Sequence, residues 1–316
     1  CRLDTRCESI EISLPGRLAS VGVMAGDGRK TRSARVLMAA ALAASVVTAV
    51  GAAPFEVRAD DEPERATDVL LQGELRMSDA VPDPVRPVFY ASRQSDEISV
   101  FDRETGDEIR SVTVPGSPGP LAIAADGSAL YVGLGTAGVV QKRSLPDLAL
   151  VWDVSIDAHP SLLDVPDDIE VSPIDPDLAV VSFRTPGSSP IHTGVFALTA
   201  GGVLPVNTAL GAGPSRLEFT DDPTVLVGHG ESATGSFWHL DLSPDGVTAT
   251  ETSTTVTDAT VNDIRFVDGR VVTSAGHLVD PSVPPTRIGQ LDGPRSDRVR
   301  VSVAVDGASG LVHGLE

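Results

Sequence analysis

Several side chains that could bind a ligand or take part in catalysis occur at recurring places in the chain, next to short apolar segments. Three of them are the arginines Arg93, Arg184 and Arg216, and two are the aspartates Asp168 and Asp263. Guanidinium groups bind carboxylate or phosphate through paired hydrogen bonds, and carboxylates orient such ligands or attract cations. If the flanking segments bring these five residues together, they predict a ligand-binding site.

Two histidines, His229 and His277, occupy similar places, and imidazole is a common ligand of divalent transition metals. No recognised motif supports them, because the chain has no His-x-x-x-His pair, no Cys-x-x-Cys-His and no Gly-x-Ser-x-Gly. No cofactor is evident from the sequence, and a divalent metal ion at His229 and His277 is a hypothesis. The alternative for all of these residues is that they are ordinary polar loop residues that bridge neighbouring units.

The segments that position these residues form a repeat. A short motif recurs as PGPLAI (118–123), PDDIEV (166–171), PSRLEF (214–219), VNDIRF (261–266) and VHGLE (312–316). Its aliphatic residues are separated by 48, 48, 47 and 51 positions; they are Leu121, Ile169, Leu217, Ile264 and Leu315. A second apolar segment follows each of the first four motifs after a turn with Asp-Gly or with Asp and Pro, which suits a hairpin.

Four strands per unit, repeated at a fixed interval, predict an all-β fold, a β-propeller of four-stranded antiparallel blades. About five blades are visible over residues 87–316. A β-sandwich also has many short strands, but it does not require the same motif in every unit. The first unit begins at its second strand, PVFYAS (87–92), and the last motif stops within its first strand. We therefore expect a propeller that is incomplete, truncated at the C-terminus.

In a propeller, the loops that lead into the first strand and those that leave the second strand lie on one face, around the central channel. The five candidate ligand-binding residues and the two histidines fall in or beside such loops, so we expect them to converge on this face. We also expect the recurring aliphatic residues to line the centre of the ring of blades, which we call the hub.

The N-terminal region has the pattern of an export signal. Residues 1–23 precede Met24, and we interpret them as upstream read-through. Residues 24–52 contain basic residues, an uncharged apolar run from Val36 to Val50 and then small residues, as in a secretory signal peptide. The run is shorter than the about 20 residues that span a bilayer, so we expect no stable membrane span after cleavage; an uncleaved anchor is the alternative. Residues 53–86 are acidic and Pro-rich, and we expect them to form a lead-in to the propeller. We expect the mature protein to be periplasmic, cell-surface or secreted.

The composition excludes several classes of protein. The chain has 24 Lys and Arg against 44 Asp and Glu, a net charge of −20, which argues against nucleic-acid binding. Two cysteines exclude a disulfide-rich scaffold. The hydrophobic fraction of 41% is sufficient for a substantial core.

One unit also resembles a known repeat. Residues 89–133 contain the strand SDEISVFD, the Thr105-Gly106 turn, the exit Val114-Pro115-Gly116 and, after Asp126-Gly127, the segment Leu130-Tyr131-Val132. These pieces resemble the YVTN-type β-propeller repeat of secreted and cell-surface bacterial proteins. The resemblance implies the fold and an extracytoplasmic location. It brings no catalytic residue with it, because the matching residues belong to hairpins and packing.

Two functions are compatible with these observations. The first is an exported, non-catalytic β-propeller that acts as a binding or scaffold module, with a protein or small ligand on its channel face. The second is an enzyme with its site on that face, either a lactonase-like hydrolase or the propeller domain of a larger oxidoreductase. Because one fold can carry many functions, the site residues must decide between them.

Overall fold

The computed structural model describes residues 77–156, 164–187, 191–208, 211, 213–230, 235–257, 261 and 263–290. It also gives the course of the backbone for short strands nearer the two ends of the chain. All regular elements in this part of the chain are β-strands. The all-β prediction is therefore confirmed.

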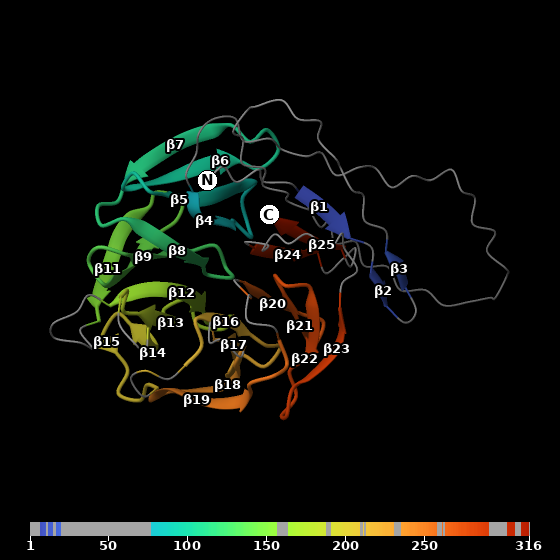
Figure 1. Ribbon diagram of the computed structural model, residues 1–316. Coiled ribbons are helices and arrows are strands. Elements are labelled where there is room, and N and C mark those ends of the chain that lie inside the picture. The colour runs from blue at the N-terminus through green and yellow to red at the C-terminus, as the bar shows by residue number, and fades with distance from the viewer. Residues whose placement is uncertain are drawn as a thin grey trace, which may run out of the picture.

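Five four-stranded antiparallel sheets follow one another along the chain and are arranged around a common centre (Figure 1). The first blade consists of β4 (Met77–Pro82), β5 (Val88–Arg93), β6 (Glu97–Asp102) and β7 (Glu108–Thr113). The second consists of β8 (Pro118–Ile123), β9 (Ala129–Leu134), β10 (Val139–Ser144) and β11 (Ala149–Ser155). The third consists of β12 (Val165–Val171), β13 (Ala179–Arg184), β14 (His192–Thr199) and β15 (Gly202–Val203).

The remaining two blades have the same plan. The fourth consists of β16 (Arg216–Phe219), β17 (Val225–His229), β18 (Phe237–Ser243) and β19 (Gly246–Ser253). The fifth consists of β20 (Ile264–Val267), β21 (Arg270–Thr273), β22 (His277–Asp280) and β23 (Thr286–Gln290). Within each blade, strands that are consecutive in sequence pair with each other, and the first strand is the innermost. These are the blades of a β-propeller, as predicted.

The first blade begins earlier than predicted. Its inner strand β4 lies within residues 53–86, the segment that we assigned to the lead-in. The sequence MSDAVP has little apolar alternation and ends in proline, so its pairing with β5 is not visible as a local pattern.

The last motif has a different place from the one predicted. VHGLE was expected to be a first strand, but β25 (Leu311–Leu315) follows β24 (Ser302–Asp306) and pairs with it. It is β24 that contacts the inner strand β20 of the fifth blade. Because VHGLE follows the previous motif by 51 residues, it was matched to the first strands of the other units. In the structure it forms a second strand instead.

The sheet that contains β24 and β25 has a third strand, β1 (Cys7–Ile10), which pairs with β25. In Figure 1 this sheet occupies the space between the fifth and the first blade. Strands β2 (Ile12–Leu14) and β3 (Arg17–Ala19) form a separate hairpin. The assignments of residues 1–23 to read-through and of residues 24–52 to a signal peptide stay predictions, the latter outside the described residues.

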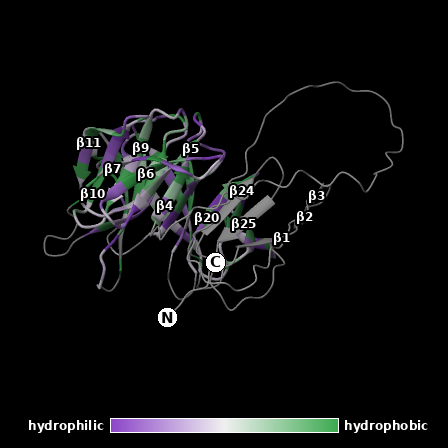
Figure 2. Ribbon diagram, turned by 90° about the horizontal axis from the view of Figure 1, so that it is seen from above, coloured by the Kyte–Doolittle hydropathy of each residue, from purple (hydrophilic) through white to green (hydrophobic). Residues whose placement is uncertain are grey.

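The hydrophobic core is divided among the interfaces between neighbouring blades. Strand β9 is buried along its whole length, because a second strand is covered on both faces, and this explains its continuous apolar sequence ALYVGL. The outermost strand β7 alternates exposed and half-buried residues instead. Figure 2 shows hydrophobic and hydrophilic residues within the strands of the blades.

The recurring aliphatic residues pack between blades rather than lining the hub. Each belongs to a different buried cluster: Leu121 packs with Tyr90 and Ile98 of the first blade, and Ile169 packs with Tyr131 of the second. Leu217 and Ile264 pack in the same way in the next two interfaces. The prediction that they line the hub was wrong, because residues alternate in direction along a strand and their polar neighbours take that position.

The hairpin turns were predicted correctly. At Asp268-Gly269 both residues have positive φ, 49° and 74°, which is the geometry of the tight turn that Asp-Gly favours. Such short connections keep the first and second strands of a blade in register, so that the ends of both strands lie at the same edge.

Candidate binding site at the hub

Arg184 and Arg216 come together at the end of the hub where the inner strands begin, which we call the hub mouth. Arg184 is the last residue of β13 and pairs with Val165, near the start of β12. Arg216 is the first residue of β16 in the next blade. The two arginines therefore flank the boundary between the third and fourth blades.

Asp167 of β12 holds both guanidinium groups. Its Oδ1 atom lies 3.0 Å from Nε of Arg184 and 3.4 Å from Nη1 of Arg216. Arg216 Nη1 also donates to the backbone carbonyls of Asp167 and Ser215, at 3.1 and 3.2 Å. Only 9% of the Asp167 side chain is exposed, against 39% for Arg184. A buried carboxylate thus orients an arginine whose outer edge is open to solvent.

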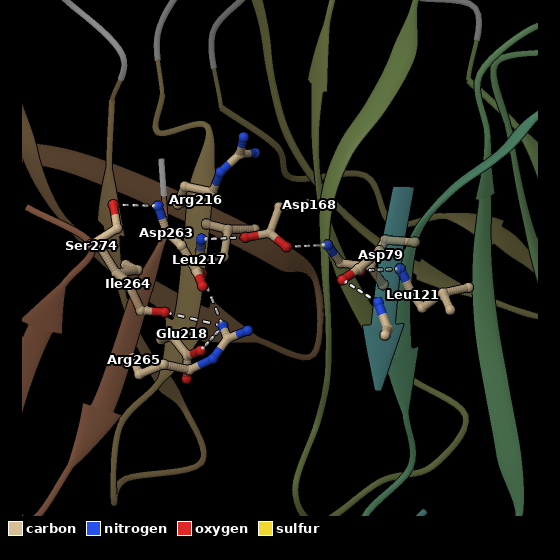
Figure 3. Close-up of polar contacts among 12 residues, drawn as sticks. Asp79, Leu121, Asp168, Arg216, Leu217, Glu218, Asp263, Ile264, Arg265 and Ser274 are labelled. Atoms are coloured by element: carbon tan, nitrogen blue, oxygen red, sulfur yellow. Dashed lines mark hydrogen bonds and ion pairs between the residues drawn. The ribbon is translucent and has the colours of Figure 1, made fainter. Parts of the chain in front are cut away.

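Asp168, the next residue, points to the neighbouring blade. Its Oδ2 atom accepts a hydrogen bond from the backbone N–H of Leu217 at 2.8 Å (Figure 3). Its Oδ1 atom accepts from the N–H of Ile169 at 2.9 Å. Burial raises the pKa of Asp168 to about 7, against the opposing attraction of Arg216. Asp168 therefore links two blades and also titrates near neutral pH.

Asp263 lies in the equivalent position of the fifth blade, one residue before Ile264. Its carboxylate is 3.2 Å from Nη1 of Arg265, and its backbone N–H donates to Ser274 Oγ at 3.2 Å. The same Arg265 nitrogen donates to Glu218 Oε1 at 2.6 Å (Figure 3). Asp263 thus clusters with Arg265 and Glu218, and Arg184 and Arg216 pair with Asp167 instead.

Four further residues lie at the hub that the sequence did not predict there: Asp79, Glu170, Glu218 and Arg265. Three of them follow the recurring aliphatic residue by one position, as in Ile169-Glu170 and Ile264-Arg265. This spacing could have identified these three residues. The residues just before and just after a core residue in a strand both point to the face of the strand opposite to the core. Asp79 lay in the segment that was not expected to form a strand.

Asp79 repeats the contact made by Asp168. Its Oδ2 atom accepts from the N–H of Leu121 at 2.8 Å, and its Oδ1 atom accepts from the N–H of Ala80 at 2.7 Å. Burial raises its pKa. The same carboxylate-to-backbone link therefore joins the first blade to the second and the third to the fourth.

His229 and His277 are both fully buried, with 0% and 1% of their surface exposed. Nε2 of His229 lies 2.6 Å from Thr257 Oγ1, which itself donates to the carbonyl of Gly235 at 3.1 Å. The Thr257 hydroxyl has one hydrogen, so Nε2 of His229 is the donor in this pair. Burial and the nearby His277 lower the pKa of His229 to about 4.

The described residues contain no group of three or more His, Cys, Asp or Glu that could hold a metal ion. The metal site at His229 and His277 stays a prediction.

Arg93 does not join the other arginines. Its guanidinium lies within the first blade, 2.6 Å from Glu108 and 3.6 Å from Glu97, and 5.9 Å from the centre of the Phe101 ring. Glu108 also accepts from Ser99 at 3.1 Å. The prediction placed Arg93 at the hub with Arg184, but acidic partners on its own blade hold it elsewhere.

No known family model matches this chain, and no curated protein matches it. Among solved structures, it is similar to hydrazine synthase from Kuenenia stuttgartiensis, with a TM-score of 0.56 and 17% sequence identity. That likeness covers 76% of this chain and 74% of the other. At this identity it supports the β-propeller fold alone. Within the described residues, no helix has the length and apolar character to cross a membrane.

Proposed function

We propose that this chain is an exported, non-catalytic β-propeller that acts as a binding module, and that it takes an anionic group of its ligand at the hub mouth. One observation carries the proposal: Asp167 holds Arg184 and Arg216 side by side at the boundary of two blades. Export rests on the signal-peptide pattern and on the resemblance to YVTN-type repeats.

Arg184 is the residue best suited to contact the ligand. Its Nε forms an ion pair with Asp167, its terminal nitrogens make no hydrogen bond or ion pair within the described residues, and 39% of the side chain is exposed. A guanidinium that is fixed at one edge presents its other donors in a defined direction, which favours planar carboxylate or tetrahedral phosphate groups. The ligand must also tolerate a chain with a net charge of −20, so we expect a small anion or a single anionic group on a larger partner.

The proposal is tested by titrating the purified chain with inorganic phosphate and with succinate, followed by calorimetry and by NMR of the arginine side chains. We expect wild-type protein to bind at least one of them, and Arg184→Gln to weaken binding by about tenfold or more, the loss of one charge-assisted contact. Asp167→Asn should weaken binding less, since both arginines remain.

Arg103→Gln is the matched control, because Arg103 lies in the turn after β6 and its replacement changes net charge equally. Absence of binding in the wild type, or equal binding by wild type and Arg184→Gln, contradicts the proposed site. Export is tested separately by N-terminal sequencing of secreted protein, which should begin near Ala53.

A further inference from the structure

Glu170 and Glu218 occupy equivalent positions on neighbouring inner strands. Each follows the buried aliphatic residue of its strand, Ile169 or Leu217, by one position, and β12 and β16 are in contact. Since Ile169 and Leu217 point into cores between blades, both glutamates point to the opposite face of their strands. Both are half-buried and lie at the hub.

The charges around these glutamates are unbalanced. Arg265 Nη1 binds Glu218 at 2.6 Å and lies 3.2 Å from Asp263. Among the residues that the structure describes, Glu170 has no hydrogen-bond or ion-pair partner, and the partners of the Asp168 carboxylate are backbone N–H groups. One guanidinium is thus shared among several half-buried carboxylates.

Several further charged groups lie on the strands at the hub. They are Asp167 and Asp168 of β12, Arg184 of β13, Arg216 of β16, Asp263 beside β20, Arg265 of β20 and Asp79 of β4. Carboxylates that share a half-buried site cannot all ionise without strong repulsion, so at least one retains its proton to higher pH. Burial first, and then repulsion by Glu218 and Asp168, raises the pKa of Glu170 well above its ordinary value.

We propose that the hub is a proton-sensitive element of the fold: ionisation of the crowded carboxyl groups of Glu170, Asp168 and Glu218 weakens the packing of the third blade against the fourth. The folded chain holds protons that the unfolded chain releases at lower pH. The stability that these protonated carboxyl groups contribute is therefore present at acidic pH and is lost as pH rises through their raised pKa values. This inference is independent of the proposed anion site, which uses Arg184 and Arg216.

Urea unfolding of the full chain between about pH 6.5 and 8.5, with a chelator present throughout, tests the inference. For each proton released, the folding equilibrium constant of the wild type should fall by up to about tenfold per pH unit. Glu170→Gln should reduce this dependence, because it removes the least compensated charge. Glu104→Gln, an exposed residue of the turn after β6, changes net charge equally and should behave as the wild type.

Equal pH dependence in wild type and Glu170→Gln overturns the proposal. A second measurement needs no variant: the side-chain carboxyl carbon of Glu170 in the ¹³C NMR spectrum should titrate well above the ordinary glutamate value. Titration near that ordinary value also overturns it.

Discussion

Asp168 in the third blade accepts the backbone N–H of Leu217 in the fourth blade, with 2.8 Å between Oδ2 and N. Asp79 makes the equivalent contact with Leu121 at the same distance, between the first blade and the second. In each case the carboxylate belongs to an inner strand, and the N–H belongs to the recurring aliphatic residue of the next blade. At these two boundaries, neighbouring blades are thus joined by apolar packing and by a directed hydrogen bond next to it.

Removing this acceptor should destabilise the chain. Asp168→Ala leaves the Leu217 N–H without its partner, and we expect a loss of about 1–3 kcal/mol in the free energy of unfolding. Asp168→Asn keeps an acceptor oxygen and should lose less. Urea unfolding near pH 5.5 is the appropriate measurement, because Asp168 is then mostly protonated and the removed charge contributes little. Equal effects of Ala and Asn would show that the hydrogen bond does not stabilise the interface.

The buried His229 should make the chain sensitive to acid. Its pKa in the folded state is about 4, below the ordinary value of about 6.5, so protonation favours the unfolded chain. The stability contributed by the neutral ring is complete above the ordinary pKa and is lost as pH falls toward 4, by up to about 3 kcal/mol. The pH dependence of urea unfolding, compared between wild type and His229→Gln, measures this. If both proteins lose stability in parallel below pH 6.5, His229 is not the cause.

The two tyrosines of the chain, Tyr90 and Tyr131, should resist ionisation. Burial and a hydrogen bond to Asp83 raise the pKa of Tyr90 to about 12, and burial also raises that of Tyr131. Ultraviolet difference absorbance should show almost no tyrosinate in the folded chain at about pH 10.5, where exposed tyrosine is mostly ionised. The urea-unfolded chain supplies the reference, and tyrosinate of similar amount in both states would contradict the burial of these rings.

A methyl group at Gly228 should destabilise the fourth blade. A Cβ atom there would lie 2.4 Å from Cγ of Pro214 and 3.0 Å from the carbonyl oxygen of Arg216, contacts that require the chain to shift. We expect Gly228→Ala to lower the free energy of unfolding by about 1–3 kcal/mol. Gly119→Ala is the matched control, because the neighbour that its Cβ would meet, the Gly133 carbonyl oxygen, is 3.7 Å away. A comparable loss in both variants would argue against a specific clash with Pro214.

The sequence determined the blades because their signals are local. Alternation, β-branched residues and turns such as Asp268-Gly269 depend on neighbours a few positions apart, and repetition reinforced them. Strand β4 escaped prediction because MSDAVP has no such local pattern and is held in place by pairing with β5. The final motif was assigned to the wrong strand for a related reason: spacing alone does not show which partner a strand pairs with.

The tertiary structure alone decided which charged residues meet. Arg93 and Arg184 occupy the same place in the repeat, yet Arg93 is held by Glu108 of its own blade while Arg184 joins Arg216 through Asp167. The repeat determined that polar residues flank a buried aliphatic position, since side chains alternate along a strand. Which of them become partners depends on distances across the hub between residues some fifty positions apart, which follow from the curvature of the assembled ring.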